Sequence, residues 1–528
     1  MKRLTRTLAV SLLCLSLAGS VSVESAWAQG KTDLSVALSS FATEVLDPAL
    51  GGHLVKYYLS LQFDYLVGTT PDGQPSPNGG IATKWEHSPD YRRWTFQLRK
   101  GVKFHNGDDL TSEDVKFSLQ RAMGKRSTTG YAGILRAMVQ DIETPAPDRV
   151  VIVTKEPALI VPNYLSRSLS TEGMVLPKKY IEANGDDVFA RKPVGSGPYR
   201  FVEQVTGSHV KLAAVDNHWR IGTPKYKNVT FRLVPEETTR IALLRRGEVD
   251  IAEVSRERVK EIEGEGFPVF FRREEAVLTM WWILGPDGMV APMKDKRVRE
   301  ALNLAIDRAE IAQAIFAGKA DPAPIPLGLS WSFRDIGLKV TPEMSYPYDP
   351  VRAKKLLADA GQAGGFPLDV YAYQLPGLPE GKAFAEAVAG YWEKIGIKTK
   401  LIPVDYPAFR KNCVDRKTPS SVGYFNIANR DWIGTFALLE KQAYTPSKPT
   451  DTVNDPEVDA MMAQVMRQTD KDKAGALMRN IYLRIRSEHL GVPVVYLHSA
   501  YATSKTLPKW TVGTVMYDLF IDQLAASK

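Results

Sequence analysis

The amino-acid sequence predicts an α/β protein with more than one domain. Segments of helical and extended character alternate along the chain, and prolines and glycines fall between these segments rather than inside them. The chain has 528 residues, well beyond the ~250–300 at which a single hydrophobic core stops growing. Its two cysteines are Cys14 and Cys413, so large apolar cores rather than disulfides must hold the fold together.

The first segment of the chain has the pattern of a secretory signal. Three basic residues among the first six precede an apolar run at residues 8–19, and Ala26-Trp27-Ala28 provides a small-residue cleavage site. The run is shorter than the ~20 residues that span a bilayer. A lipoprotein signal would carry a small residue before Cys14, where this chain has Leu13. We therefore expect a signal peptide at residues 1–28, cleavage after Ala28 and a soluble exported protein.

Polar residues crowd the stretch from 94 to 119, WTFQLRKGVKFHNGDDLTSEDVKFSL, and raise the question of a metal or catalytic site. Residues 94–98 alternate as in a half-buried strand, and Asn106-Gly107 is a tight-turn pair. Thr111 stands three residues before Asp114, which is close to a capping box at a helix start. The acids lack the spacing of an EF-hand loop. We interpret this stretch as scaffold.

A β-α-β unit is predicted in the middle of the chain. Residues 228–234 have the pattern of a strand, residues 236–246 that of a helix, and residues 249–254 that of a second strand. Gly247 stands where a helix end favours the left-handed conformation.

Several helices and one strand later in the chain are also predicted from short runs of neighbouring residues. Residues 296–306 place apolar side chains at i, i+4 and i+7, as in an amphipathic helix. The helices expected at 349–361 and 455–468 each begin with Asp-Pro, an N-cap residue followed by proline at the first helical position. Residues 493–498 are a short apolar run and predict a buried strand. The strongest cluster of chain-breaking residues in the middle of the chain is 285–292.

Motifs of catalysis and of metal binding do not occur. Ser196 lies in a GSG sequence that lacks the spacing of the G-x-S-x-G nucleophile elbow. The seven histidines form no H-E-x-x-H pattern, and no G-x-x-x-x-G-K-[ST] loop is present. The formal charge of +8 comes from basic residues scattered among acids, which favours an ordinary soluble surface over a nucleic-acid partner. The sequence predicts no enzyme and no cofactor.

Five segments, in this order along the chain, resemble one protein family. They are similar to the extracellular solute-binding proteins of family 5, the dipeptide- and oligopeptide-binding components of bacterial ABC importers. The segments are residues 81–122, 192–203, 216–253, 295–311 and 348–361.

The resemblance implies a two-lobed type II periplasmic-binding-protein fold with an extra subdomain in lobe one. By analogy, lobe one comprises residues 29–285, with the subdomain at about 75–190, and is completed by residues 493–528. Lobe two comprises residues 286–492. The stretch at 94–119 would then lie in the subdomain, away from the ligand cleft.

Three regions are candidates for ligand contact. The loop SSFATEVLDP follows the first mature strand, and in the family this loop touches ligand backbone, which makes Phe41, Ala42 and Thr43 candidates. Its alternative is an ordinary strand-to-helix loop. Trp281 and Trp282 face opposite sides of an expected strand near the hinge, so one of them can meet ligand. The alternative is that both are buried in lobe packing.

The third region is NIANRDWIGTF. Peptide-binding relatives have an aspartate here that holds the ligand's α-ammonium, three residues after a tryptophan and seven before a phenylalanine. Counting back from Phe436 reaches Asn429, and Asn426 replaces the tryptophan. Asp431 takes the role only if the loop is shifted by two residues. The candidates are Asn429, Arg430, Asp431 and Trp432.

The function implied is that of a periplasmic receptor for an ABC importer. It captures a peptide or peptide-like solute between its lobes and delivers it to the inner-membrane ABC permease, and we expect it to work as a monomer. The family also carries opines, oligosaccharides, nickel complexes, haem and glutathione, so the cargo stays open. An exported hydrolase and a chaperone with an open cleft are the alternatives from other classes.

Overall fold

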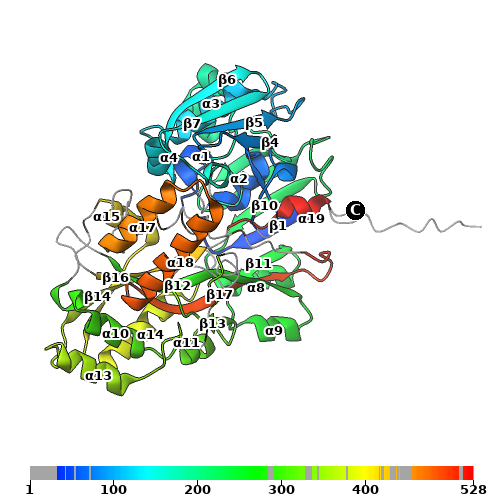
Figure 1. Ribbon diagram of the computed structural model, residues 1–528. Coiled ribbons are helices and arrows are strands. Elements are labelled where there is room, and N and C mark those ends of the chain that lie inside the picture. The colour runs from blue at the N-terminus through cyan, green and yellow to red at the C-terminus, as the bar shows by residue number, and fades with distance from the viewer. Residues whose placement is uncertain are drawn as a thin grey trace, which may run out of the picture.

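The computed structural model describes residues 32–526 except 42, 53–54, 71–72, 170, 284–289, 327–335, 340, 342–343, 376–377, 416, 418–420, 429–435, 437–438, 440–454, 511–514 and 516. Figure 1 shows these elements, and its labels are used below.

One large mixed sheet runs through the molecule. It is 11-stranded, with the order β15-β14-β16-β12-β17-β11-β1-β10-β9-β8 and β13 added on β17. Its strands, in chain order, are β1 (Asp33–Leu38), β8 (Tyr199–Val205), β9 (His209–Ala214), β10 (Asn228–Leu233), β11 (Ile251–Val254), β12 (Val269–Ile283), β13 (Ala320–Pro322), β14 (Pro367–Ala372), β15 (Lys398–Pro403), β16 (Ser421–Ala428) and β17 (Val492–Thr503).

Two long antiparallel strands, β12 and β17, join the two halves of this sheet. The early part of β12 pairs with the late part of β17, from Val269 opposite Ala502, and β17 there also pairs with β11. The later part of β12 pairs with β16 on its other side, from Ala276 opposite Ala428 to Ile283 opposite Ser421. The chain therefore passes between the two lobes along a pair of hydrogen-bonded strands.

A separate antiparallel sheet, β4-β5-β7-β6, forms the core of a subdomain at the top of Figure 1. Its strands are β4 (Ala82–His87), β5 (Arg93–Leu98), β6 (Val139–Ala146) and β7 (Arg149–Thr154). A two-stranded ribbon, β2 (Gly68–Thr69) and β3 (Pro75–Ser76), lies outside both large sheets.

Helices cover these sheets. Those that precede β12 are α1 (Pro48–Gly51), α2 (Lys56–Gln62), η2 (Pro77–Gly79), α3 (Ser112–Ala122), α4 (Ala132–Met138), α5 (Val161–Tyr164), α6 (Lys178–Asn184), α7 (Asp186–Arg191), α8 (Glu237–Arg245) and α9 (Val259–Gly264). Those that follow it are η3 (Ala291–Lys294), α10 (Lys296–Leu304), α11 (Arg308–Ala314), α13 (Pro350–Asp359), α14 (Gly381–Lys394), α15 (Tyr406–Val414), α17 (Pro456–Met466), α18 (Lys471–Ser487) and α19 (Ile521–Ala526).

Each lobe has its own apolar core. Lobe one packs around β1 and β8 to β11, and the subdomain adds a third core beneath its own sheet. Lobe two packs around β14, β16 and the later part of β12, with α10, α14 and α18. Six subdomain residues, Tyr131, Ile134, Leu135, Ile160, Tyr164 and Leu169, belong to this core of lobe two, so the subdomain and lobe two are in contact.

The local predictions are confirmed. The β-α-β unit is β10, α8 and β11, with Gly247 at a φ of 72°, and β1 lies between the two strands and parallel to both. The predicted helices begin at their Asp caps, Asp349 and Asp455. The strand expected at 493–498 extends over Val492–Thr503, because it crosses from one lobe to the other.

The stretch at 94–119 is scaffold, as predicted. Thr111 and Asp114 form the capping box of α3, and the Thr111 amide and hydroxyl both donate to Asp114 Oδ2 at 2.9 Å. Asp114 Oδ1 accepts from the Lys178 amide at 3.0 Å, which ties α3 to α6. Gly107 has a φ of 91°, as the turn requires.

Candidate functional site

The loop after β1 is fixed at its start by a buried acid. Glu253 on β11 is only 2% exposed, and its Oε2 accepts from both the amide and the hydroxyl of Ser39, each at 2.8 Å. A carboxylate that accepts two hydrogen bonds holds its partner in one position. The loop therefore leaves the sheet in a fixed direction.

The far end of the same loop is held by the subdomain. Thr171 Oγ1 donates to the Pro48 carbonyl at 2.8 Å, and Thr128 Oγ1 donates to the Leu50 carbonyl at 2.7 Å. Asp47 caps α1 and forms an ion pair with Arg121 at 2.5 Å. The loop and the start of α1, together called the loop at residues 39–50 below, are thus braced at both ends.

The candidates on this loop differ in their exposure. Phe41 is 2% exposed and packs edge-on against Tyr58, with ring centroids 5.8 Å apart. Thr43 is exposed. Ala42 lies outside the described residues. Contact with ligand stays a prediction for all three, and the burial of the Phe41 side chain leaves its main chain to make that contact.

The two tryptophans on β12 are both buried, each 1% exposed. A Cβ placed on Gly491 would lie 3.1 Å from Trp281 Cε3, so Trp281 packs directly on that backbone. Neither indole nitrogen has a hydrogen-bond partner among the described residues. Buried indole N–H groups usually find one. The prediction that one of Trp281 and Trp282 meets ligand stays a prediction.

The third candidate region, Asn429, Arg430, Asp431 and Trp432, lies outside the described residues. Its two flanks are placed. Before it, β16 ends at Ala428 opposite Ala276, where β12 passes from one lobe to the other. After it, Phe436 is 2% exposed in the core of lobe two. The two flanks therefore lie at the crossing strands and on the face of lobe two that meets the subdomain.

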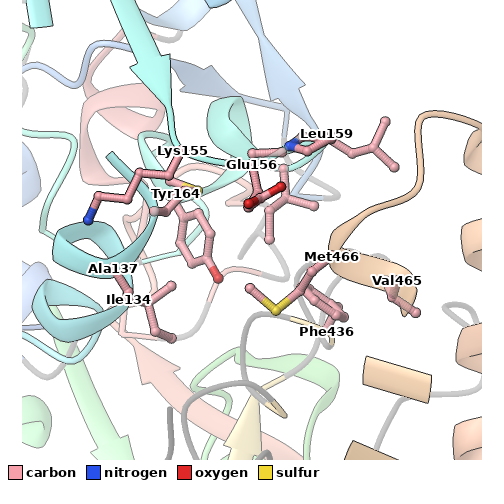
Figure 2. Close-up of a pocket in the computed structure, with 13 residues that line it drawn as sticks. Ile134, Ala137, Lys155, Glu156, Leu159, Tyr164, Phe436, Val465 and Met466 are labelled. Atoms are coloured by element: carbon pink, nitrogen blue, oxygen red, sulfur yellow. The ribbon is translucent and has the colours of Figure 1, made fainter. Parts of the chain in front are cut away.

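An apolar pocket opens where lobe two meets the subdomain (Figure 2). Its volume is about 110 Å³. The subdomain wall includes Ile134, Ile160 and Tyr164, and lobe two contributes Phe436 and Met466. Because the walls belong to different lobes, the shape of this pocket depends on how the lobes sit against each other.

A buried ion pair also joins the lobes. Arg256, just after β11, donates from Nη1 to Glu380 Oε2 at 2.7 Å, and Glu380 directly precedes α14 in lobe two. Arg256 Nε donates to the carbonyl of His498 on β17 at 2.8 Å. The Arg256 side chain is 1% exposed, so the pair is shielded from water.

The GSG sequence before β8 is a close-packed turn. His105 Nδ1 accepts from the Gly195 amide at 3.2 Å, and its Nε2 therefore carries the proton that is donated to the Gly197 carbonyl at 2.8 Å. Both ring nitrogens are engaged by backbone, so His105 has no free nitrogen to take a proton from Ser196. Burial lowers the pKa of His105 to about 4, which keeps the ring neutral. This arrangement does not support the hydrolase alternative.

A metal site and a membrane-spanning helix are both absent from the described part of the chain. No group of three or more His, Cys, Asp and Glu side chains there has the geometry to hold a metal ion. No helix among those described residues is both long and apolar enough to cross a bilayer.

Sequence reasoning missed Glu253, Arg256 and Glu380. An acid inside the apolar strand segment VDIAEV was a signal that Glu253 has a buried partner, because buried carboxylates are almost always paired. For Arg256 and Glu380 the spacing of 124 residues offers no such signal.

Comparisons of sequence and of structure both find binding proteins among the relatives of this chain. A heme-binding protein A of Haemophilus influenzae is 25% identical over 83% of this chain and 82% of its own. A dipeptide-binding protein of Escherichia coli is 26% identical over 71% of each chain. The periplasmic binding protein DppA of Helicobacter pylori, solved with the peptide STSA, is 22% identical, covers 94% of this chain and 97% of its own, and superposes with a TM-score of 0.78.

That superposition confirms the two-lobed type II periplasmic-binding-protein fold. The family described as "Bacterial extracellular solute-binding proteins, family 5 Middle" matches residues 76–454, the greater part of the sequence. The chain belongs to the bacterial extracellular solute-binding proteins of family 5.

Proposed function

We propose that this protein is the substrate-binding component of a bacterial ABC importer. It captures a peptide or peptide-like solute between its lobes and delivers it to an inner-membrane permease. The observation that carries the proposal is that β12 and β17 join two separately cored lobes. Two rigid bodies joined by a few strands can close around a ligand whose contacts favour the closed state.

Peptide is the cargo that the relatives favour, since dipeptide-binding and peptide-bound proteins are among them. We place the backbone of the ligand along the loop at residues 39–50, whose two ends are held in place, because main-chain hydrogen bonds suit a ligand that itself has a peptide backbone. Heme binding in the Haemophilus influenzae relative supports a non-peptide cargo as the second candidate.

The proposed lobe boundaries are those expected from the sequence. Lobe one comprises residues 29–285 and the return segment 493–528, with the subdomain at about 75–190, and lobe two comprises residues 286–492. The proposed location is the periplasm, after cleavage of residues 1–28. The protein acts as a monomer, catalyses no reaction and binds no nucleic acid.

The test begins with the cargo itself. The protein is purified without unfolding from the periplasm of the cells that produce it, and any solute that it carries is identified by mass spectrometry. The solute is then titrated calorimetrically into the emptied wild type, Asp431→Asn and Trp432→Ala. If Asp431 holds a ligand cation in a closed cleft, Asp431→Asn weakens binding at least a hundredfold, since breaking such a pair costs ~3–5 kcal/mol.

Asp472→Asn is the matched control, because Asp472 is exposed on α18. Its affinity should equal that of the wild type. If Asp431 merely caps the following helix, asparagine replaces it at little cost. Unchanged binding in both Asp431→Asn and Trp432→Ala contradicts the assignment of this loop to the site.

A further inference from the structure

The pocket between lobe two and the subdomain has the properties of a side-chain subsite. Its walls are almost wholly apolar, with Ile134, Met138 and Ile160 on the subdomain side and Phe436, Val465 and Met466 on the lobe-two side. Figure 2 shows Ile134 and Tyr164 on one side of the space and Phe436 and Met466 on the other. We propose that this pocket binds one branched aliphatic or thioether side chain of the cargo. The proposal rests on the proposed function and specifies its substrate class.

The size of the pocket sets the size of the group that it takes. Its volume is about 110 Å³. An apolar cavity of ~150 Å³ holds benzene, so a space of this size holds roughly four or five carbon atoms. The side chains of leucine, isoleucine and methionine have this size, whereas an indole or a phenol exceeds it.

The position of the pocket connects it to the braced loop. A Cβ placed on Gly52, at the end of α1, would lie 4.0 Å from the amide nitrogen of Gly130. The helix α4, which provides Ile134 and Met138, begins at Ala132, directly after this contact. Tyr164, which lines the pocket, packs against Tyr131 with ring centroids 5.6 Å apart, so the pocket lies on the side of the subdomain that contacts the end of α1.

Two charged residues stand at the mouth. Lys155 directs its Nζ away from the pocket, to the carbonyl of Arg136 at 3.0 Å. Glu156 also lines the pocket, and it is exposed. No ion pair engages Glu156 within the described residues. An acidic side chain of the cargo would meet this charge at close range, so the pocket excludes it.

Both halves of the pocket carry a methionine, Met138 from the subdomain and Met466 from lobe two. Methionine is unbranched and polarisable, so it adapts to guests of slightly different shape. The pocket exists only while these two walls face each other. An apolar guest in it therefore adds a contact that favours the closed arrangement of the lobes.

The experiment uses an equimolar pool of tripeptides in which each position is Ala, Leu, Phe or Asp. The pool is mixed with the full-length protein, and retained peptides are identified by mass spectrometry after rapid gel filtration. The wild type should enrich peptides with leucine at one fixed position and deplete those with aspartate there. Complete burial of such a side chain gives roughly a ten- to hundredfold preference over alanine.

Two variants change the pocket in opposite directions. Ala137→Phe fills it from an exposed position on α4, and should shift retention toward alanine. Met466→Ala enlarges it, and should shift retention from leucine toward phenylalanine. A variant that only hinders lobe closure lowers all retention and does not change the preferred size. Ala183→Phe, exposed on α6, is the matched control and should retain the wild-type set.

The outcomes separate this proposal from the proposed function. If the wild type, Ala137→Phe and Met466→Ala all retain the same peptides, the proposal that this pocket binds a cargo side chain is refuted. If no peptide is retained, the proposed peptide-binding function is refuted. Whether the pocket binds a branched aliphatic group is then tested with 3-methylbutan-1-ol as the probe. The NMR signals of the ¹³C-labelled methyl groups of Met138 and Met466 should then shift in the wild type and not in Ala137→Phe. Absence of that shift overturns the pocket as well.

Discussion

Arg167 is held between two buried aspartates that come from the far end of the chain. It pairs with Asp518 at 2.6 Å and with Asp522 at 2.8 Å, and Asp522 also pairs with Arg220 at 2.7 Å. The side chains of Arg167, Asp518 and Asp522 are 7%, 3% and 0% exposed. Burial by itself would raise the pKa of Asp522, but the charges of Arg167 and Arg220 hold that pKa well below its usual range. These four side chains carry two positive and two negative charges, and the buried Lys56 also helps to lower the pKa of Asp518.

The substitution Asp522→Asn keeps the shape of the side chain and removes its charge. Arg167 then keeps only the carboxylate of Asp518, and Arg220 loses the carboxylate that it pairs with, in a nearly dry site. Removing one partner from a buried pair costs ~3–5 kcal/mol. Arg220 is 16% exposed, and water at that end places the expected loss toward the lower end of this range. This is a large part of the ~5–15 kcal/mol that stabilises a typical native protein.

The free energy of unfolding is measured by urea titration, with tryptophan fluorescence as the signal. Asp109→Asn is the matched control, because Asp109 pairs with Lys103 at 2.6 Å but is 68% exposed. Exposed pairs contribute ~1 kcal/mol or less.

The folded-state pKa of Asp522 is depressed, so its contribution to stability is present above the unfolded pKa of ~3.9 and is lost as pH falls toward the folded value. The wild type should therefore lose more stability below about pH 4 than Asp522→Asn does. A loss in Asp522→Asn no larger than that of Asp109→Asn refutes this reasoning.

Three further changes test the scaffold. Thr111→Ala removes the hydroxyl hydrogen bond to Asp114 and should cost ~1 kcal/mol of stability in urea titration, with cargo affinity unchanged. His105 has a pKa lowered to about 4, so the unfolded chain, with a pKa of ~6.5, binds the proton first. The melting temperature should fall as pH drops from about 6.5 toward 4, and His105→Gln should reduce that slope. Gly195→Ala places a methyl group 2.0 Å from the Gln62 carbonyl oxygen and should destabilise by at least ~1–3 kcal/mol, whereas Gly264→Ala, with no atom within 4 Å, should not.

Features that depend on neighbouring residues were predictable from the sequence. The cap of α3 needs only the spacing of Thr111 and Asp114, and the end of α8 needs only the freedom of Gly247 at a positive φ. The Asp-Pro starts of α13 and α17 are equally local. In each case the interacting groups lie within one turn of each other, so their spacing alone determines the geometry.

Features that depend on the path of the chain were not predictable in this way. Alternation along β12 places Trp281 and Trp282 on opposite faces, but it does not say that both faces are covered. Both are buried because β12 lies between β16 and β17 in the middle of the sheet, with helices packed on it. Ser39 and Glu253 are 214 residues apart, and only the parallel neighbours β1 and β11 bring them together.

The pairing of Arg167 with residues 351 and 355 positions further along has a consequence for how the protein is made. A chain synthesised from its N-terminus exposes Arg167 and Arg220 long before Asp518 and Asp522 are available. Folding lobe one at that stage would bury two cations without their counter-charges, which is strongly unfavourable. We therefore expect the nascent polypeptide to stay loose until those aspartates emerge. A polypeptide that stays loose is one that a secretion pore can thread.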